Sequence, residues 1–167
     1  MSQLSDPLNY KDSLILIAED NAITLQLLCR FLDKEGLKYI TCNNGSAAIN
    51  LANKKLPDLI LLDVTMPQID GFDTCRILKD NTATKNIPVI FLSSKSDSFN
   101  KLKGFSAGAI DFITKPFEKV EIMVRIKTQL KLKKALDKLS DYSNELEKTL
   151  NEETEKESFL SKHIHQN

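Results

Sequence analysis

Short apolar runs alternate with amphipathic segments along most of the chain. Continuous apolar runs are typical of strands buried in a parallel sheet, and they predict strands over residues 13–18, 37–42, 58–64, 88–93 and 109–114. Between them, helical periodicity predicts helices over 21–35, 46–55, 72–81 and, as a weak one, 96–105, with a last helix from residue 117. A strand–helix pair repeated five times favours an α/β fold: a doubly wound, five-stranded parallel sheet with helices on both faces.

The pattern changes after residue 117, where one long helix is expected. No glycine or proline follows Pro116, and Leu, Lys, Glu, Asp, Ser and Thr dominate. Apolar residues recur in steps of three and four residues, or in multiples that keep the phase: Leu132, Leu136, Leu139, Leu146, Leu150, Leu160 and Ile164. This seam predicts a coiled coil, weakened where Ser143, Glu153 and Glu157 take seam positions. A parallel homodimer is the expected use, and a single helix folded back on the domain is the alternative.

Composition and charge narrow the classes of function. With 167 residues and a hydrophobic fraction of 41%, the chain can form one full core plus an extension. The formal net charge of zero gives no support to direct nucleic-acid binding or to an acidic-membrane surface. Neither a bilayer-length apolar run nor signal-peptide order occurs, so a cytoplasmic protein without membrane contact is expected. Cys29, Cys42 and Cys75 fall in apolar patterns and are interpreted as buried thiols.

Polar residues stand at the carboxyl ends of four predicted strands. Glu19 and Asp20 follow the first strand, and Asp63 ends the third. Ser93 ends the fourth, and Lys115 follows the fifth. Ligands of parallel sheets bind at this edge, and three carboxylates gathered there would repel one another unless a hard cation such as Mg²⁺ offset their charge. A carboxylate beside Mg²⁺ and a lysine suits phosphoryl transfer, with Asp63 as the nucleophile.

Four short motifs then carry a resemblance to a known family. EDN after the first strand, DVTMPQIDGFD at the end of the third, LSSK at the end of the fourth and KPFE after the fifth resemble the receiver domain of two-component response regulators, over residues 11–127. The resemblance implies the flavodoxin-like receiver fold and a phosphoryl group that Asp63 accepts from a histidine kinase or phosphotransfer protein. It also implies Mg²⁺ on Asp20, Asp63 and the Thr65 backbone carbonyl, with Glu19 acting through bound water.

The same resemblance assigns roles around the phosphoryl group. Ser93 and Lys115 would hold phosphoryl oxygens. Ser93 would also act with Phe112 as a switch, because the ring can turn inward when the hydroxyl moves toward the phosphoryl group. Gly71 would allow a backbone conformation that a side chain resists, and the peptide before Pro116 would be cis.

Each role also has a plainer interpretation. Asp63 could cap a helix or close a turn, Lys115 could be a solvated lysine, and Ser93 could bond to backbone. Glu19 could be a solvated neighbour, and Phe112 an ordinary core residue. The motifs occur together in the family's order and spacing, which favours the receiver roles.

Three classes of function remain. The favoured one is a phosphoacceptor response regulator, not an enzyme beyond its own phosphorylation and slow dephosphorylation, which signals through its C-terminal coiled coil. It would comprise an N-terminal tail over residues 1–10, a receiver over 11–127 and the coil over 128–167. The second class is a piece of a larger protein whose output is a histidine kinase, a nucleotide cyclase or a cyclic-dinucleotide enzyme.

Two further resemblances bear on these classes. The segment SFLSKHIHQN resembles the start of a kinase phosphoacceptor helix, with His165 at the phosphorylated place, although His163 and His165 are expected to face solvent. The third class, a phosphatase of the haloacid dehalogenase type, is suggested by Asp63 and Thr65. It is disfavoured because that family places its nucleophile after the first strand and a second Asp two residues later.

Overall fold

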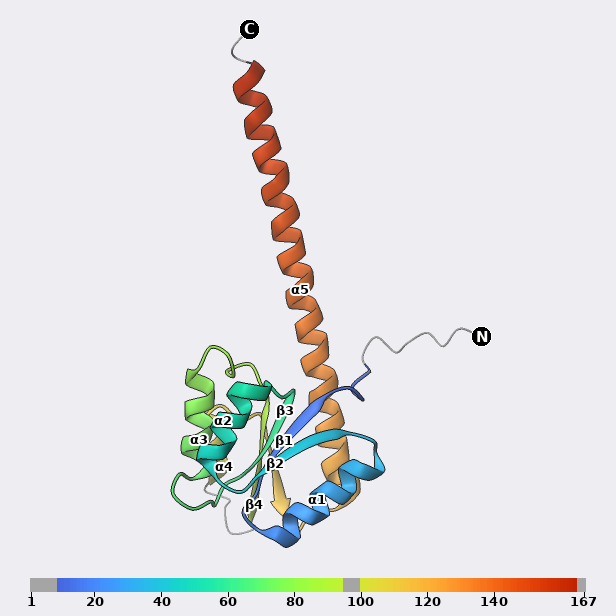
Figure 1. Ribbon diagram of the computed structural model, residues 1–167, viewed down its shortest axis with the longest axis vertical. Coiled ribbons are helices and arrows are strands. Elements are labelled where there is room, and N and C mark those ends of the chain that lie inside the picture. Colours follow the sequence, from blue (N-terminus) through green and yellow to red (C-terminus); the bar gives the residue numbers. More distant parts are fainter. Residues whose placement is uncertain (1–8, 95–99, 165–167) are drawn as a thin grey trace, which may run out of the picture. The chain divides into compact units, whose positions relative to one another are not determined.

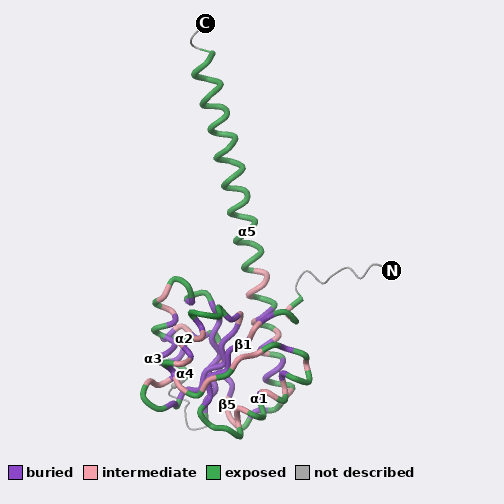
Figure 2. Tube along the Cα trace, in the orientation of Figure 1, coloured by how far each residue is buried: buried purple, intermediate pink, exposed green. Residues whose placement is uncertain are grey.

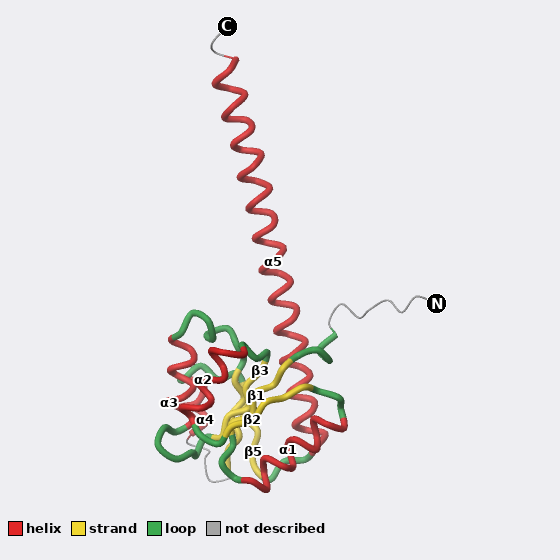
Figure 3. Tube along the Cα trace, viewed as in Figure 1, coloured by secondary structure: helices red, strands yellow, loops and turns green. Residues whose placement is uncertain are grey.

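A single parallel sheet organises the computed structural model, which describes residues 9–94 and 100–164. Its five strands are β1 (Leu14–Ala18), β2 (Lys38–Cys42), β3 (Leu59–Asp63), β4 (Val89–Ser94) and β5 (Asp111–Lys115), in the order β2-β1-β3-β4-β5. The helices are α1 (Ala22–Lys34), α2 (Gly45–Lys55), α3 (Gly71–Asp80), α4 (Asn100–Ser106) and α5 (Lys119–Ile164). Figure 3 shows the alternation of strand and helix. The predicted doubly wound, flavodoxin-like receiver fold with a long last helix is confirmed.

Helices cover both faces of this sheet. In Figure 1, α2, α3 and α4 lie on one side of the strands, and α1 and the first turns of α5 lie on the other. Successive residues of β1 enter opposite cores, since side chains alternate along a strand. Leu16 packs in a core with Ala48 of α2 and Cys75 of α3. Ile17 belongs to the other core, which includes Leu28 of α1.

Short polar side chains begin the helices that follow the strands. The Asn21 side chain accepts hydrogen bonds from the N–H groups of Ile23 and Thr24, both at 3.0 Å, and so caps α1. Asp70 caps α3 in the same way by accepting from the Asp73 N–H at 2.8 Å. These caps satisfy helix N–H groups that have no partner inside the helix. They fix where each helix leaves the carboxyl edge of the sheet.

Two elements and two cysteines differ from expectation. The described part of α4 begins at Asn100, and residues 95–99 of the predicted helix lie outside the described residues. Strand β5 begins two residues later than predicted and includes Lys115, because the Ala109 N–H still donates to the carbonyl of Gly104 in the turn after α4. Cys75 is buried, but Cys29 and Cys42 are only half-buried. The prediction that these two thiols are buried was wrong. Cys42 lies in an edge strand of the sheet, and Cys29 lies at the margin of its core.

The chain divides into two units after Lys133. In the first unit, α5 adds Ile122, Met123, Ile126 and Leu130 to the core. In the second unit, every described residue from Leu136 to Ile164 is exposed, as Figure 2 shows in green. The expected boundary after residue 127 stays a prediction, and the expected N-terminal tail lies outside the described residues apart from Asn9 and Tyr10.

Among the described helices, none combines the length and the apolarity needed to cross a membrane. The cytoplasmic location also stays a prediction.

Candidate functional site

Three carboxylates meet at the carboxyl edge of the sheet. One oxygen from each of Glu19, Asp20 and Asp63 lies within 4.8 Å of the others. They come together because β1 and β3 are neighbours, with Ala18 opposite Leu62, so the residues that follow lie side by side. Glu19 and Asp63 are buried, whereas Asp20 is exposed.

Lys115, at the end of β5, brings a positive charge to this cluster. Its Nζ lies 2.8 Å from Glu19 Oε2 and 3.3 Å from Asp63 Oδ1. Burial disfavours the charged ammonium, but the hydrogen bond to Glu19 and the charge of Asp63 outweigh burial and raise the pKa of Lys115. One ammonium is therefore shared between two buried carboxylates.

The surroundings of Asp63 shift the pKa of its carboxyl group. Burial, followed by the hydrogen bond and negative charge of Glu19, raises the pKa of Asp63 to about 7. Lys115 and the Thr65 N–H, which donates to Asp63 Oδ1 at 3.2 Å, oppose that rise. The carboxylate needs more positive charge than the described residues supply if it is to be fully ionised near neutral pH.

Both carboxylate oxygens of Glu19 have a partner at the site. Its Oε1 accepts a hydrogen bond from the Asn21 N–H at 3.0 Å. Its Oε2 is buried and pairs with the Lys115 ammonium, whose Nζ lies 2.8 Å away. A carboxylate oxygen has more than one lone pair, so Oε2 can accept a water molecule or a cation in addition to the lysine. The donor set consists of carboxylate oxygens, which fits a hard divalent cation such as Mg²⁺.

The loop after β3 folds tightly against the strand that carries Asp63. A Cβ on Gly71 would lie 2.2 Å from the Asp63 carbonyl oxygen and 2.9 Å from Val64 Cα. Gly71 has no positive φ, so its requirement is space and not the unusual conformation expected from the sequence. The positive φ in this loop belongs to Gln68, at +70°, which sequence reasoning missed.

Ser93 and Phe112 occupy the neighbouring strand ends. Ser93 is buried in β4, one residue beyond Leu92, which pairs in register with Asp63. The Phe112 ring is buried, with its centroid 5.2 Å from that of Phe91. The structure therefore shows the Phe112 ring in its inward position. The roles of Ser93 and Phe112 as a switch stay predictions. The Lys115–Pro116 peptide is cis, as expected.

An apolar surface adjoins the site and was not found from the sequence. Ile23 and Leu27 of α1 are exposed, at 80% and 38%. With Lys115, Pro116 and Phe117 they line a hollow of about 300 Å³. The sequence carried no clear signal for it, because Ile23 belongs to the apolar pattern of the helix expected over 21–35, and only the structure shows that it lies outside the buried pair Leu28 and Leu32.

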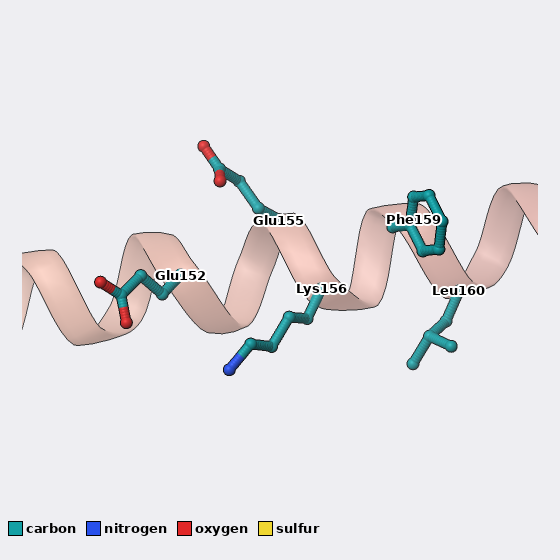
Figure 4. A pocket seen from close by; sticks show the side chains of 5 residues that line it. All are labelled: Glu152, Glu155, Lys156, Phe159 and Leu160. Atoms are coloured by element: carbon teal, nitrogen blue, oxygen red, sulfur yellow. The ribbon is translucent and has the colours of Figure 1, made fainter.

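A larger hollow lies along α5 alone. It has a volume of about 590 Å³ and is lined by the five side chains that Figure 4 shows: Glu152, Glu155, Lys156, Phe159 and Leu160. All five project from one exposed helix, so they do not enclose a ligand. Nearby, the exposed His163 ring stacks on Phe159 with centroids 4.1 Å apart, and His165 lies outside the described residues.

Comparisons with known proteins agree with this geometry. A family model described as the response regulator receiver domain matches residues 15–127. Response regulator PleD of Caulobacter vibrioides is 37% identical over 125 residues, which cover 75% of this chain and 28% of PleD. The structure of a putative response regulator from Chloroflexus aurantiacus is 33% identical with a TM-score of 0.69, over 71% of this chain and 98% of that one.

A further structure shows the fold alone. The receiver domain of sensor histidine kinase PA1611 from Pseudomonas aeruginosa, with a magnesium ion in its active site cleft, is 24% identical with a TM-score of 0.67, over 71% of this chain and 98% of that one. The chain spans little more than a quarter of the length of PleD. The family model, in contrast, covers well over half of the present chain. The chain therefore belongs to the response regulator receiver family.

Proposed function

We propose that Asp63 accepts a phosphoryl group from the phosphohistidine of a histidine kinase or phosphotransfer protein. The observation that carries this proposal is the placement of Lys115 Nζ within 3.3 Å of a buried carboxylate that lies beside two further carboxylates. As a receiver the chain is a signalling module, and the transfer to its own side chain is its chemistry. The third strand carries Asp63, and Thr65 stands two residues later, which disfavours the haloacid dehalogenase alternative.

The transfer needs one bond made and one broken. An oxygen of the Asp63 carboxylate attacks phosphorus, a P–O bond forms, and the P–N bond to the donor imidazole breaks with its electron pair leaving on nitrogen. The Lys115 ammonium would bind one phosphoryl oxygen and offset its negative charge. The Ser93 hydroxyl would donate a hydrogen bond to another phosphoryl oxygen. The metal would rest on Asp20, Asp63 and the Thr65 carbonyl, with Glu19 acting through water. Bound there, Mg²⁺ supplies neutralisation of the carboxylate and phosphoryl charge.

The apolar surface beside the site supports a protein as phosphoryl donor. Ile23, Leu27 and Phe117 present apolar atoms next to Lys115, and such a patch is suited to the side of a helix from a partner protein. A small phosphorylated metabolite would have no use for it. The donor's imidazole would then approach Asp63 over α1.

The output is proposed to pass through α5 as a parallel homodimer. The seam residues of the second unit are exposed by 55% to 72%, which leaves a row of large apolar side chains in water along one helix. A second copy of the same helix would cover this row, since heptad seams pack knobs into holes. The switch of Ser93 and Phe112 would alter the packing of this dimer. We propose no direct nucleic-acid contact, because the formal net charge of the chain is zero.

A second candidate is favoured by the comparison with PleD. Because the match spans only 28% of that relative, the chain can be the receiver end of a protein with an enzymatic output. In that case α5 would connect the receiver to a kinase, cyclase or cyclic-dinucleotide domain. The length of the open reading frame distinguishes the two candidates.

Phosphorylation with a small donor tests the proposal directly. Incubation with Mg²⁺ and phosphoramidate is expected to add one phosphoryl group per chain in intact-mass spectrometry, and Asp63→Asn is expected to remove it. Asp12→Asn, a change in an exposed carboxylate, serves as the matched control and should be labelled like the parent. Labelling of Asp63→Asn at the parental rate would show that another residue is the acceptor.

A further inference from the structure

Gly104 of α4 has no room for a side chain, because the ring of Phe112 takes that space. A Cβ on Gly104 would lie 2.2 Å from Phe112 Cζ, 2.6 Å from Cε2 and 3.0 Å from Cδ2 of Phe91. Phe105, next along α4, contacts the same ring edge-on with centroids 5.3 Å apart. The helix therefore sits directly on the aromatic ring of β5, through a notch that only glycine leaves.

Backbone hydrogen bonds attach the carboxyl end of α4 to the sheet. The Gly104 carbonyl accepts hydrogen bonds from the N–H groups of Ala107 and Ala109, both at 3.1 Å. One residue later, the Ile110 N–H donates to the Val89 carbonyl at 3.0 Å and joins the chain to the sheet. These bonds tie the notch to β4 through only a few residues of backbone.

Helix α3 adds two side-chain contacts to this anchor. The Cys75 thiol donates to the Ala107 carbonyl at 3.4 Å. The stem of Lys79 packs against Gly108, where an added Cβ would lie 2.8 Å from Cγ. If the notch were filled, the ring of Phe112 is the part that can yield, because it turns about its own side-chain bonds past the half-exposed Phe105.

We propose that Gly104 is a positioning residue for the switch: its missing side chain lets Phe112 stay buried under α4, and the buried ring holds α4 seated. This inference rests on the proposed function only in linking Phe112 to phosphorylation of Asp63. A methyl group at position 104 displaces the ring toward solvent. In such a variant the position of the Phe112 ring would no longer depend on whether Asp63 is phosphorylated.

Fluorine NMR tests the placement without phosphorylation. The chain has 8 phenylalanines, so 4-fluorophenylalanine labelling gives a small set of signals, and Phe112→Leu identifies the one of interest. In the parent, a soluble gadolinium chelate should broaden this signal only slightly, because the ring is buried. In Gly104→Ala the same chelate should broaden it several-fold more, because the ring is displaced toward solvent. Leu102→Ala, an exposed change on the same helix, should match the parent. A folded Gly104→Ala chain whose Phe112 signal keeps its position and its protection would overturn the proposal.

A double variant covers the case in which Gly104→Ala does not fold. Gly104→Ala with Phe112→Leu has a smaller side chain in the contested space, and it should recover the fold. Failure to recover it would show that the methyl group clashes with something other than the ring, and the proposal would be wrong.

Phosphorylation separates this inference from the proposed function. With phosphoramidate and Mg²⁺, the Phe112 signal should shift in the parent and stay fixed in Gly104→Ala, while mass spectrometry shows Asp63 modified in both. If Asp63 is not modified in the parent, the phosphoacceptor proposal fails and the gadolinium result still decides the role of Gly104. An equal shift of the Phe112 signal in the parent and in Gly104→Ala would show that Gly104 does not couple the ring position to phosphorylation of Asp63.

Discussion

At the scale of single residues, the proposed phosphoacceptor role places two opposing requirements on Asp63. A buried carboxylate is shielded from water, which protects a reactive acyl phosphate, but burial also opposes the ionised form that must attack phosphorus. Lys115 lies close enough to relieve part of this cost, and Glu19 adds to it. A divalent cation on the same oxygens would shift the balance toward the ionised nucleophile.

The raised pKa predicts how Asp63→Asn changes stability with pH. An aspartate in an unfolded chain titrates near about 3.9, whereas folding raises the pKa of Asp63 to about 7. Between these values the folded state holds a proton that the unfolded chain has released, so the parent loses stability as pH rises through this window. Without metal, Asp63→Asn should be more stable than the parent at pH 8 by about 1–2 kcal/mol and similar at pH 5. Thermal denaturation at both pH values measures it.

Two results would bear on the cause of that difference. Added Mg²⁺ should narrow the gap at pH 8, because the ion stabilises the ionised carboxylate of the parent and lacks that ligand in the Asn variant. An equal gap at pH 5 and pH 8 would mean that the pKa of Asp63 is not raised by folding.

Asp20 gives a prediction about the cation alone. Asp20→Asn removes one hard anionic oxygen from the cluster without creating a cavity, since the side chain is exposed. Mg²⁺ affinity should fall by roughly tenfold or more in calorimetric titration. Asp12→Asn should leave it unchanged, and an unchanged affinity in Asp20→Asn would remove Asp20 from the proposed ligands.

The sequence predicted which residues gather at the site because strand ends in a parallel sheet share one edge. It did not predict contacts that depend on side-chain packing. The Phe112 ring in the notch of Gly104 is such a contact, because no local pattern encodes the distance between these two segments. The hydrogen bond from the Asn21 N–H to Glu19 joins residues only two apart, but it depends on the side-chain conformation of Glu19. Gly71 illustrates the same limit: its place in the motif was visible, but whether it is needed for backbone angle or for space was not.

At the scale of elements, periodicity predicted the type and order of the strands and helices, with boundaries within a few residues wherever the structure describes them. The start of β5 was placed too early because its apolar pattern begins inside a turn that belongs to α4. Two backbone hydrogen bonds end α4, one from the Ala109 N–H to the Gly104 carbonyl and one from the Gly108 N–H to the Phe105 carbonyl, and Gly108 takes the positive φ of 102° that this cap requires. Gly108 was therefore a local signal for this boundary, which the apolar pattern of residues 109–114 did not take into account.

The seam of α5 makes a prediction that exposure alone cannot make. Leu146, Leu150 and Phe159 are almost equally exposed, at 65%, 63% and 62%, but only the two leucines lie on the seam. If the seam pairs two chains, Leu146→Ser with Leu150→Ser should lower the mass measured by ultracentrifugation from dimer to monomer. Each buried leucine contributes on the order of 1.5–3 kcal/mol to such pairing before ordering costs.

Phe159→Ser is the matched control for the seam. It removes an exposed apolar group outside the seam, so the dimer should persist. A parent chain that is already monomeric, or a control that dissociates as readily as the double variant, would contradict the coiled-coil proposal whatever the receiver does with phosphate.

At the scale of the whole molecule, the two units should unfold separately. Among the residues that the structure describes, every buried side chain lies before residue 131, whereas the second unit is one helix that is exposed from Leu136 onward. In a dimer, the coil is stabilised by association and the receiver by its own core. Circular dichroism at increasing protein concentration should therefore show a helical transition whose midpoint rises and a second transition that stays fixed. One transition without any concentration dependence would contradict this division.

The order of the strands has a consequence for how the chain reaches its native state. Neighbours β1 and β3 are separated in sequence by β2 and two helices, so a large loop must close before they can pair. Glu19 and Asp20 meet Asp63 only after that closure. An ion held by Asp20 and Asp63, with Glu19 acting through water, would bind the finished sheet and not the unfolded chain, adding about 1.4 kcal/mol to the free energy of unfolding at ten times its dissociation constant. The supply of magnesium to a newly made chain would then influence how completely it folds.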